Sequence, residues 1–294
     1  MSWIGVDWGT SSLRGARFDE SGKVLEERAF ARGVLTVEKG GFGAVFDECF
    51  GDWMAPIGTR CLISGMAGSQ QGWVEAPYIA CPATLDGIAG KLVWVEPGRI
   101  AIVPGMSCEH DGAPDVMRGE EVQILGALQL LGLERGVFVL PGTHSKWVRV
   151  EAGRIEGFET LMTGEFYALL RKHSILARTL PAEDGEPVQS AFDLGVAQAL
   201  RSPGLMQSAF SVRTMSLFER LPINERPSYL SGLVIGEEVR MRRLADGDAV
   251  VVIGDPALTR RYERVLGSRG VRVRSVGAAA TWNGLWSIAR RIVG

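Results

Sequence analysis

Two turns with the same plan constrain this chain most, because each places a glycine and hydroxyl side chains between two strand-like runs. The first is Asp7-Trp8-Gly9-Thr10-Ser11-Ser12, and the second is Pro141-Gly142-Thr143-His144-Ser145-Lys146. Glycine lets backbone N–H groups approach a phosphate, and hydroxyls add donors. Either turn alone is also compatible with a plain surface hairpin. Together they indicate two lobes that bind a phosphate chain from both sides.

Strands and helices follow the same order in both halves of the chain. The first half predicts a three-strand meander, an apolar helical face from Phe42 to Trp53, a hairpin, a loop from Pro104 to Arg118, and a helix from 120 to 131. The second half predicts strands, a mostly helical stretch over 164–244, and a strand–helix–strand–helix end. We therefore expect an α/β fold with lobes at 1–132 and 133–277, a cleft between them, and a final helix (278–294) that returns to the first lobe.

Composition excludes several classes of protein. Lys and Arg number 32 against 34 Asp and Glu, so a net charge of −2 predicts neither nucleic-acid binding nor membrane-surface binding. No apolar run reaches 18 residues, and the first residues lack a basic signal-peptide region. The four cysteines form no C-x-x-C pair, and Cys108-x-His110 is too sparse to predict zinc. We expect a cytoplasmic protein with reduced thiols, and a homodimer is a candidate oligomeric state.

A third feature is the strand 249–253 that leads into Gly254-Asp255-Pro256. Pro256 suits the first position of a helix, and Asp255 suits its N-cap. The pattern is typical of an ordinary strand-to-helix turn, and Gly254 also leaves room for a flat ligand. It lacks G-x-G-x-x-G, and the chain contains no G-x-x-x-x-G-K-[ST], so neither a Rossmann dinucleotide site nor a P-loop is indicated.

Both turns, Thr163-Gly164-Glu165, and the run 231–237 with Gly254 together resemble the 2-dehydro-3-deoxygalactonokinase family. That family belongs to the sugar kinase–actin–heat-shock ATPase superfamily, and the similarity extends to about Arg264. The resemblance implies a two-lobed actin-like ATPase (ribonuclease H-like) fold. It also implies ATP and Mg²⁺ as cofactors, and a sugar acid as the phosphate acceptor.

The resemblance also implies roles for individual residues. Asp7 would hold Mg²⁺, while the second turn begins with Pro141 where the superfamily often has an acidic residue. Phosphate binding would fall to Gly9, Thr10, Ser11, Ser12, Gly142 and Thr143. The adenosine would be framed by Gly232, Gly236 and Gly254.

The acceptor requires a carboxylate base and cationic partners for its own carboxylate. The candidates for the base are Asp115, Glu120 and Glu121, of which Asp115 ranks first and Glu120 second, although acids are also common at a helix N-terminus because of its dipole. The candidate partners of the substrate carboxylate are Arg14, His144, Lys146, His110 and Arg118.

The sequence thus predicts ATP-dependent phosphorylation of 2-dehydro-3-deoxy-D-galactonate to its 6-phosphate, in galactonate catabolism. Two alternatives remain open. One is a related enzyme: a kinase for another sugar acid, or a phosphohydrolase that uses water. The other is an actin-like nucleotide-binding protein without a sugar acceptor.

Overall fold

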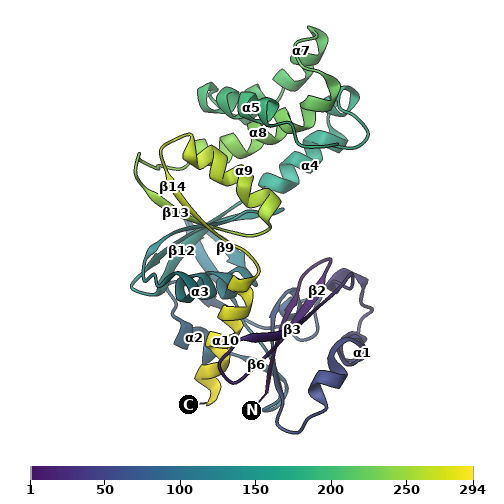
Figure 1. Cartoon of the computed structure of the whole chain (residues 1–294), viewed down its shortest axis with the longest axis vertical. Coiled ribbons are helices and arrows are strands. Elements are labelled where there is room, and N and C mark those ends of the chain that lie inside the picture. The colour runs from purple at the N-terminus through teal and green to yellow at the C-terminus, as the bar shows by residue number, and fades with distance from the viewer. Residues whose placement is uncertain (1, 294) are drawn as a thin grey trace. The chain divides into compact units, whose positions relative to one another are not determined.

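A computed structural model describes residues 2–293 of the chain (Figure 1). Two compact units are distinguished by their internal contacts. The first unit comprises the chain up to Phe138, the segment Trp147–Glu159 and the chain from Val276, and the second comprises Val139–Lys146 and Thr160–Ser275. The C-terminal segment is thus grouped with the first unit. The proposed lobe boundary at residue 132 stays a prediction.

The first unit contains a six-stranded sheet in the order β3-β2-β1-β4-β7-β6. β1 pairs antiparallel with β2 and parallel with β4, so the predicted meander of the first three strands is confirmed. The apolar side chains of β1 are buried on both faces, as expected for a central strand. The strands are β1 (Trp3–Trp8), β2 (Leu13–Phe18), β3 (Val24–Phe30), β4 (Arg60–Gly65), β6 (Val93–Glu96) and β7 (Ile100–Ile102).

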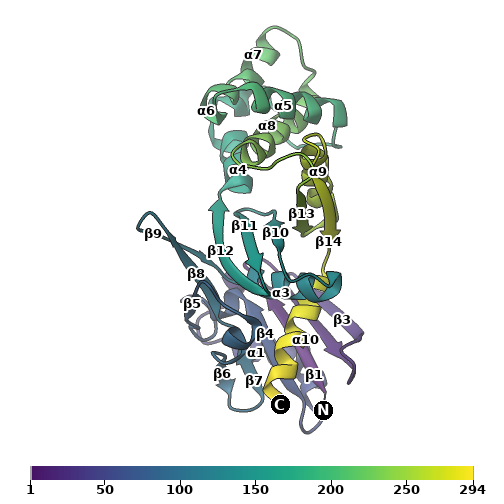
Figure 2. The same ribbon diagram turned by 90° about the vertical axis from the view of Figure 1, so that its left-hand side faces the viewer.

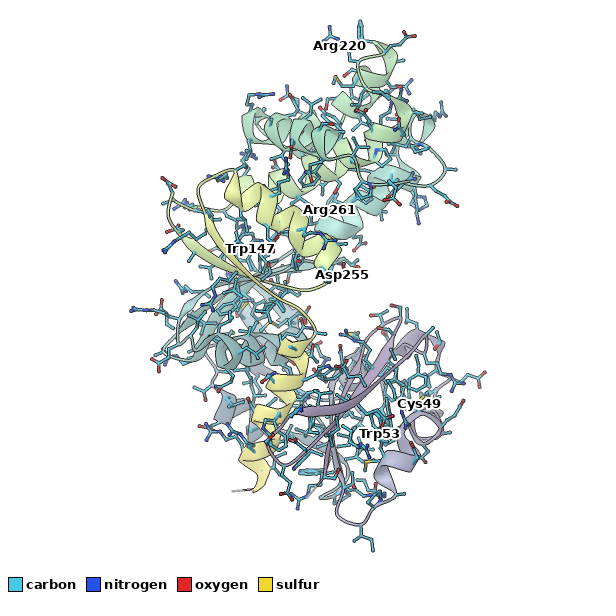
Figure 3. The ribbon with its side chains drawn as sticks, viewed as in Figure 1. Cys49, Trp53, Trp147, Arg220, Asp255 and Arg261 are labelled. Carbon is cyan, nitrogen blue, oxygen red and sulfur yellow. The ribbon has the colours of Figure 1, made fainter. Side chains whose placement is uncertain are left out.

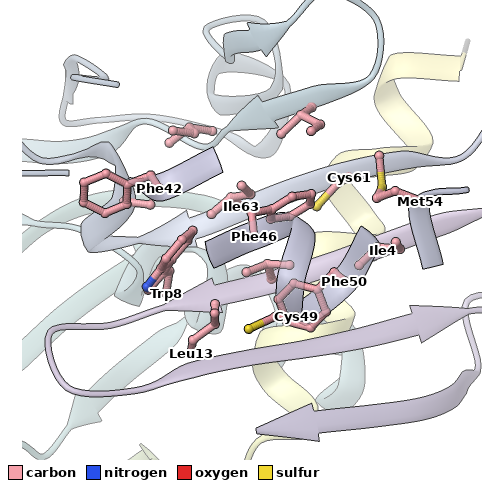
Figure 4. Close-up of a cluster of buried hydrophobic side chains, with 14 of the residues drawn as sticks. Ile4, Trp8, Leu13, Phe42, Phe46, Cys49, Phe50, Met54, Cys61 and Ile63 are labelled. Carbon is pink, nitrogen blue, oxygen red and sulfur yellow. The ribbon is translucent and has the colours of Figure 1, made fainter. Parts of the chain in front are cut away.

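Helix α1 (Phe42–Met54) covers part of this sheet with the predicted apolar face. Phe42, Phe46 and Phe50 recur at intervals of four and are buried together with Trp8 and other residues of the central strands (Figure 4). Phe42 meets Trp8 edge-on, with ring centroids 5.4 Å apart. The core therefore packs against the end of β1, where the first turn begins.

Helix α3 (Glu120–Leu131) and the C-terminal helix α10 (Ala279–Val293) pack against each other within the first unit (Figure 2). Their backbones touch at two glycines. A Cβ on Gly126 would lie 1.8 Å from the carbonyl oxygen of Ala280, and one on Gly284 would lie 1.9 Å from that of Val122. This contact fixes α3, which begins at the candidate acidic residues. The shorter elements of the unit include α2 (Leu85–Ala89) and the 3-10 turns η1 (Val34–Thr36) and η2 (Met66–Gly68).

The predicted loop from Pro104 to Arg118 is wrong. It forms β8 (Gly105–His110) and β9 (Ala113–Met117), which pair with β5 (Tyr78–Ala80) in a three-stranded sheet of order β5-β8-β9. The two-residue turn at Asp111 and Gly112 has positive φ at both positions, which suits a hairpin. Pro114 and the charged residues in this segment indicated a loop. A proline is nevertheless tolerated in an edge strand, and β9 lies at the edge of its sheet.

A five-stranded sheet has the order β12-β11-β10-β13-β14, and the division between units passes through its first three strands. The strands are β10 (Gly136–Leu140), β11 (Ser145–Glu151), β12 (Arg154–Leu161), β13 (Ala249–Ile253) and β14 (Arg272–Val276). The helices of the second unit are α4 (Thr163–His173), α5 (Gln189–Arg201), α6 (Leu205–Ser208), α7 (Ser211–Leu217), α8 (Arg226–Arg240) and α9 (Pro256–Gly267), with 3-10 turns η3 (Ile175–Thr179) and η4 (Ile223–Glu225).

Among residues 2–293, no helix has the length and apolar composition needed to cross a bilayer.

Candidate active site

The first turn is held in one conformation by its neighbours. The N–H of Gly9 donates to the Ser12 carbonyl at 2.9 Å, and Val34 and Leu35 donate to the Gly9 and Thr10 carbonyls at 3.0 and 3.3 Å. Because its carbonyls are already bound, the turn is fixed. Thr10, Ser11 and Ser12 are exposed, so their hydroxyls are available to a ligand.

Asp7 and Arg14 form an ion pair across β1 and β2. The two residues are register partners, and Nη2 of Arg14 lies 2.5 Å from Oδ2 of Asp7. The Asp7 side chain is 14 % exposed and that of Arg14 is 38 % exposed, so the pair remains open to small ligands. The structure thus places the charge of Arg14 at the first turn, on the carboxylate that we expect to bind Mg²⁺.

Gly65, at the end of β4, connects Asp7 to the start of helix α3. Gly65 has φ of +90° and Gly119 has φ of +106°, conformations that L side chains rarely adopt. A Cβ built on Gly65 would lie 2.8 Å from the Trp8 carbonyl and 3.3 Å from Oδ1 of Asp7. A Cβ built on Gly119 would lie 3.3 Å from Cα of Gly65. Three segments distant in sequence therefore meet beside the first turn.

Two neighbouring acids at the start of α3 have different environments. Oε2 of Glu120 accepts from the backbone N–H of Arg118 at 2.9 Å, and its side chain is partly exposed. Both carboxyl oxygens of Glu121 lie within 2.9 Å of the Gly119 N–H, and this side chain is fully buried. Burial, together with the charge of Glu120, raises the pKa of Glu121 to about 8. Glu121 therefore caps the helix, while Glu120 remains accessible.

Arg118 reaches the segment before β5. Its Nη2 donates to the Ala76 carbonyl at 2.7 Å, and its Cζ lies 4.3 Å from the ring centroid of Tyr78. Its Nε and Nη1 groups are buried and have no hydrogen-bond partner among residues 2–293. A guanidinium with free donors is suited to a carboxylate, since Arg can bind one through two parallel hydrogen bonds.

Asp115 and His110 lie in the β8–β9 hairpin, which precedes helix α3 in the chain. Asp115 lies on β9 opposite Cys108 of β8, and its Oδ1 accepts from the Val116 N–H at 2.7 Å. Nε2 of His110 lies 2.6 Å from the Phe158 carbonyl. These two predicted site residues thus lie on paired strands of the hairpin.

The second turn packs on the start of helix α4. Glu165 donates its N–H to the Thr143 carbonyl at 3.0 Å, and a Cβ on Gly164 would lie 2.5 Å from the Gly142 carbonyl. Nε2 of His144 lies 2.6 Å from Oε2 of Glu165, with both side chains exposed. The motif Thr163-Gly164-Glu165 therefore packs directly against the second turn.

Behind the second turn is a buried polar network that sequence reasoning missed. Oε2 of Glu238 on α8 accepts from the hydroxyls of Thr163 and Tyr262, the latter at 2.7 Å, and Tyr262 also lies 3.0 Å from the Ser145 hydroxyl. Burial, followed by the charge of Glu238, raises the pKa of Tyr262 well above its usual value, so it stays a donor. No local motif marks Glu238, because its partners Thr163 and Tyr262 are distant in sequence.

Lys146 is 6 % exposed, and its Nζ donates to the Thr160 hydroxyl at 2.6 Å. The amine of Lys146 is thus buried beside β12 within the second unit. Its predicted role with the substrate carboxylate stays a prediction, but the structure also gives it a local role in joining two strands.

Gly254 lies beside the second turn, with its built Cβ 3.8 Å from the Pro141 carbonyl. Asp255 caps α9 by accepting from the Ala257 N–H at 2.8 Å, as predicted. On the next turns of α9, Nη1 of Arg261 lies 3.0 Å from the Ser231 hydroxyl of α8 (Figure 3 labels Asp255 and Arg261). The guanidinium of Arg261 thus joins α9 to α8, a contact that the sequence did not indicate.

Gly232 and Gly236 lie where α8 crosses α5. A Cβ on Gly232 would be 2.1 Å from the Phe192 carbonyl, and one on Gly236 would be 2.9 Å from Cβ of Ala199. Close helix packing thus explains both residues, and their assignment to adenosine stays a prediction.

The second unit also contains a cavity of about 640 Å³ with a mainly apolar lining. Met162 and Phe166 line it from the α4 side, Met206 from α6, and Val234 and Met241 from the α8 side. Thr163, Val234 and Glu237 from the motifs that carry the family resemblance line this cavity, but none of the residues with a predicted role does.

Comparison with known proteins decides the family. The model of the 2-keto-3-deoxy-galactonokinase family matches residues 7–288. The chain belongs to this family. The 2-dehydro-3-deoxygalactonokinase of Escherichia coli (strain K12) is 35% identical over 99% of this chain and 98% of its own. A relative from Rhizobium meliloti (strain 1021), named as a probable 2-dehydro-3-deoxygalactonokinase, is 39% identical over 99% of this chain and 97% of its own.

Solved structures agree with that assignment. A family member from Sinorhizobium meliloti superposes with a TM-score of 0.89 at 39% identity, with 99% of both chains covered. Component A of (R)-2-hydroxyglutaryl-CoA dehydratase from Acidaminococcus fermentans superposes with a TM-score of 0.53 at 14% identity, with 99% of both chains covered, and so shows likeness of fold alone. The predicted family and the actin-like α/β fold of this galactonokinase-family chain are confirmed.

Proposed function

We propose that the chain transfers the γ-phosphoryl group of ATP to the terminal hydroxyl of 2-dehydro-3-deoxy-D-galactonate, giving the 6-phosphate. The family match and the names of the relatives support the reaction. The observation that carries the assignment of residues is the meeting of Asp7, Gly65 and Gly119, which brings the start of α3 to the first turn.

The fixed turn Gly9–Ser12 would bind phosphate oxygens through its backbone N–H groups and exposed hydroxyls. Gly142 and Thr143 would bind phosphate in the same way, and Gly254 would contact the adenosine with Gly232 and Gly236 as further candidates. In such a transfer the protein contributes mainly positioning and charge neutralisation. The rigid turns described above suit that task.

Asp7 would hold Mg²⁺, because it offers a hard oxygen donor that is partly exposed at a strand end. When bound, Mg²⁺ neutralises charge on the phosphates. Arg14 holds its own positive charge on the same carboxylate. Arg14 therefore fits the phosphate side of the site better than the acceptor carboxylate.

Glu120 is the base that we propose for the acceptor hydroxyl. As the hydroxyl oxygen bonds to phosphorus and the bond to ADP breaks, the carboxylate of Glu120 takes the hydroxyl proton. Asp115, our first candidate from the sequence, lies on β9 opposite Cys108 of β8, and its Oδ1 accepts from the Val116 N–H. Arg118 would bind the substrate carboxylate with its unpartnered Nε and Nη1 groups.

The test is a coupled ADP-release assay with ATP, Mg²⁺ and a panel of sugar acids. We expect turnover with 2-dehydro-3-deoxygalactonate, less with its C4 epimer, and a product that mass spectrometry identifies as the 6-phosphate. A faster rate with the epimer would assign the chain to another sugar acid. Phosphate release without any acceptor would indicate a hydrolase or an actin-like nucleotidase.

Arg118→Ala should raise the acceptor KM at least tenfold with little change in the KM for ATP, since a charge-assisted hydrogen bond contributes about 1.5–3 kcal/mol. An unchanged acceptor KM would indicate that Arg14, His110, His144 or Lys146 binds the substrate carboxylate instead. The homodimer and the cytoplasmic location stay predictions.

A further inference from the structure

Three side chains with different ligand chemistry meet toward the turn end of the β8–β9 hairpin. A ligand atom of Cys108, one of His110 and one of Asp115 all lie within 4.8 Å of one another. Cys108 and Asp115 are register partners across the two strands, and His110 follows two residues later on the same face of β8. The sequence spacing showed only the Cys and the His, because the third group arrives from the paired strand.

We propose that this cluster is a binding site for a transition-metal ion of the Zn²⁺ class, separate from the phosphate-binding residues. Thiolate and imidazole are the ligands that such ions prefer, whereas Mg²⁺ prefers oxygen. The cluster supplies one sulfur, one nitrogen and one oxygen donor. Cys108 and Asp115 are partly exposed and His110 is exposed, so an ion can enter from solvent.

The distances fit a tetrahedral ion. Zinc bonds of about 2.3 Å to sulfur and about 2.0 Å to nitrogen place the two atoms roughly 3.5 Å apart. Sγ of Cys108 lies 3.3 Å from Nε2 of His110. Both atoms contact the carbonyl oxygen of Phe158 in this structure, Sγ at 3.0 Å and Nε2 at 2.6 Å. Binding would release the thiol proton to solvent, and water or this carbonyl would complete the coordination.

Cys81 provides an internal control. Its backbone N–H donates to the Ser107 carbonyl at 2.8 Å, so it lies beside Cys108 in the parallel β5–β8 pairing. Burial raises the pKa of Cys81 to about 12, with a smaller contribution from Cys108. Cys81 lies outside the three-ligand cluster, so replacing it should leave metal binding unchanged.

The experiment titrates the EDTA-treated full-length protein with Co²⁺ and then displaces Co²⁺ with Zn²⁺. We expect one Co²⁺ per chain with a thiolate-to-cobalt charge-transfer band, and no displacement by excess Mg²⁺. Cys108→Ser should abolish the band. His110→Ala should weaken binding by at least about 100-fold, beyond the 10–100-fold typical of losing an outer-shell partner. Asp111→Asn, at the exposed tip of the same hairpin, should bind within about twofold of the parent, as should Cys81→Ser.

A second measurement does not depend on how the variants fold. Zn²⁺ should protect Cys108 of the unmodified protein from alkylation, as located by mass spectrometry, and excess Mg²⁺ should not. A band that persists in Cys108→Ser, a band lost in Cys81→Ser, or no protection of Cys108 would each overturn the proposal. None of these readouts depends on kinase activity.

Discussion

Replacing Glu120 by Gln removes the proposed base while keeping the size of the side chain. The amide oxygen of Gln can still accept the hydrogen bond that Arg118 donates at 2.9 Å, so the start of α3 should keep its structure. Loss of general-base catalysis costs about 10²–10⁴-fold in kcat. At about 1.36 kcal/mol for each tenfold change, this corresponds to roughly 2.7–5.4 kcal/mol of transition-state stabilisation. Nucleotide affinity should change little.

The assay compares Glu120→Gln with two matched variants, by steady-state ADP release and by thermal unfolding. Glu121→Gln should keep near-normal kcat, because Glu121 is fully buried and its raised pKa, about 8, keeps it largely protonated near neutral pH. Asp115→Asn should also keep near-normal kcat. If Glu120→Gln retained kcat within about threefold, or if Asp115→Asn alone lost activity, the assignment of the base would be refuted.

Four further predictions follow from the geometry. Asp7→Asn should remove most turnover and weaken Mg²⁺ dependence without unfolding the chain, as Mg²⁺ titration of activity would show. Arg14→Ala should raise the KM for ATP more than the acceptor KM, and the reverse order would assign Arg14 to the substrate. Gly126→Ala should lower the free energy of unfolding in urea by about 1–3 kcal/mol, because its Cβ would lie 1.8 Å from a carbonyl of α10, whereas Gly267→Ala has open space and should not destabilise. Glu121 binds its proton more tightly when folded, since its pKa rises from 4.5 to about 8. Its contribution to the free energy of unfolding is therefore lost as pH rises through that range. In Glu121→Gln, the free energy of unfolding measured in urea should fall less over the same pH range than it does in the parent.

Local patterns predicted the parts of the fold that depend on local physics. The apolar spacing from Phe42 to Trp53 forms helix α1, and Asp255 caps α9. The first three strands form the expected meander because short turns join them. The β8–β9 hairpin was missed because Pro114 and the charged residues obscured its strands, although Asp111 and Gly112 form a two-residue hairpin turn.

The site was predicted unevenly for the same reason. The two Gly-Thr turns are contiguous in sequence, so their residue types indicated phosphate binding directly. The choice between Asp115 and Glu120 depends on which segment lies beside Gly65, and no spacing along the chain contains that contact. Glu238 could not be predicted from the sequence, because its partners Thr163 and Tyr262 lie 75 and 24 residues away.

The glycine content connects these observations. The chain has 38 glycines in 294 residues, and the structure shows that several stand where backbone meets backbone. Gly65 joins β4 to the first turn, Gly164 joins α4 to the second, and Gly126 joins α3 to α10. Each contact fixes one end of an element that carries a candidate catalytic or phosphate-binding residue. A phosphoryl-transfer site that acts mainly by positioning needs such rigid seats. These glycines therefore help to hold the candidate site residues in place, while others, such as Gly40, Gly58 and Gly98, occupy open positions with positive φ.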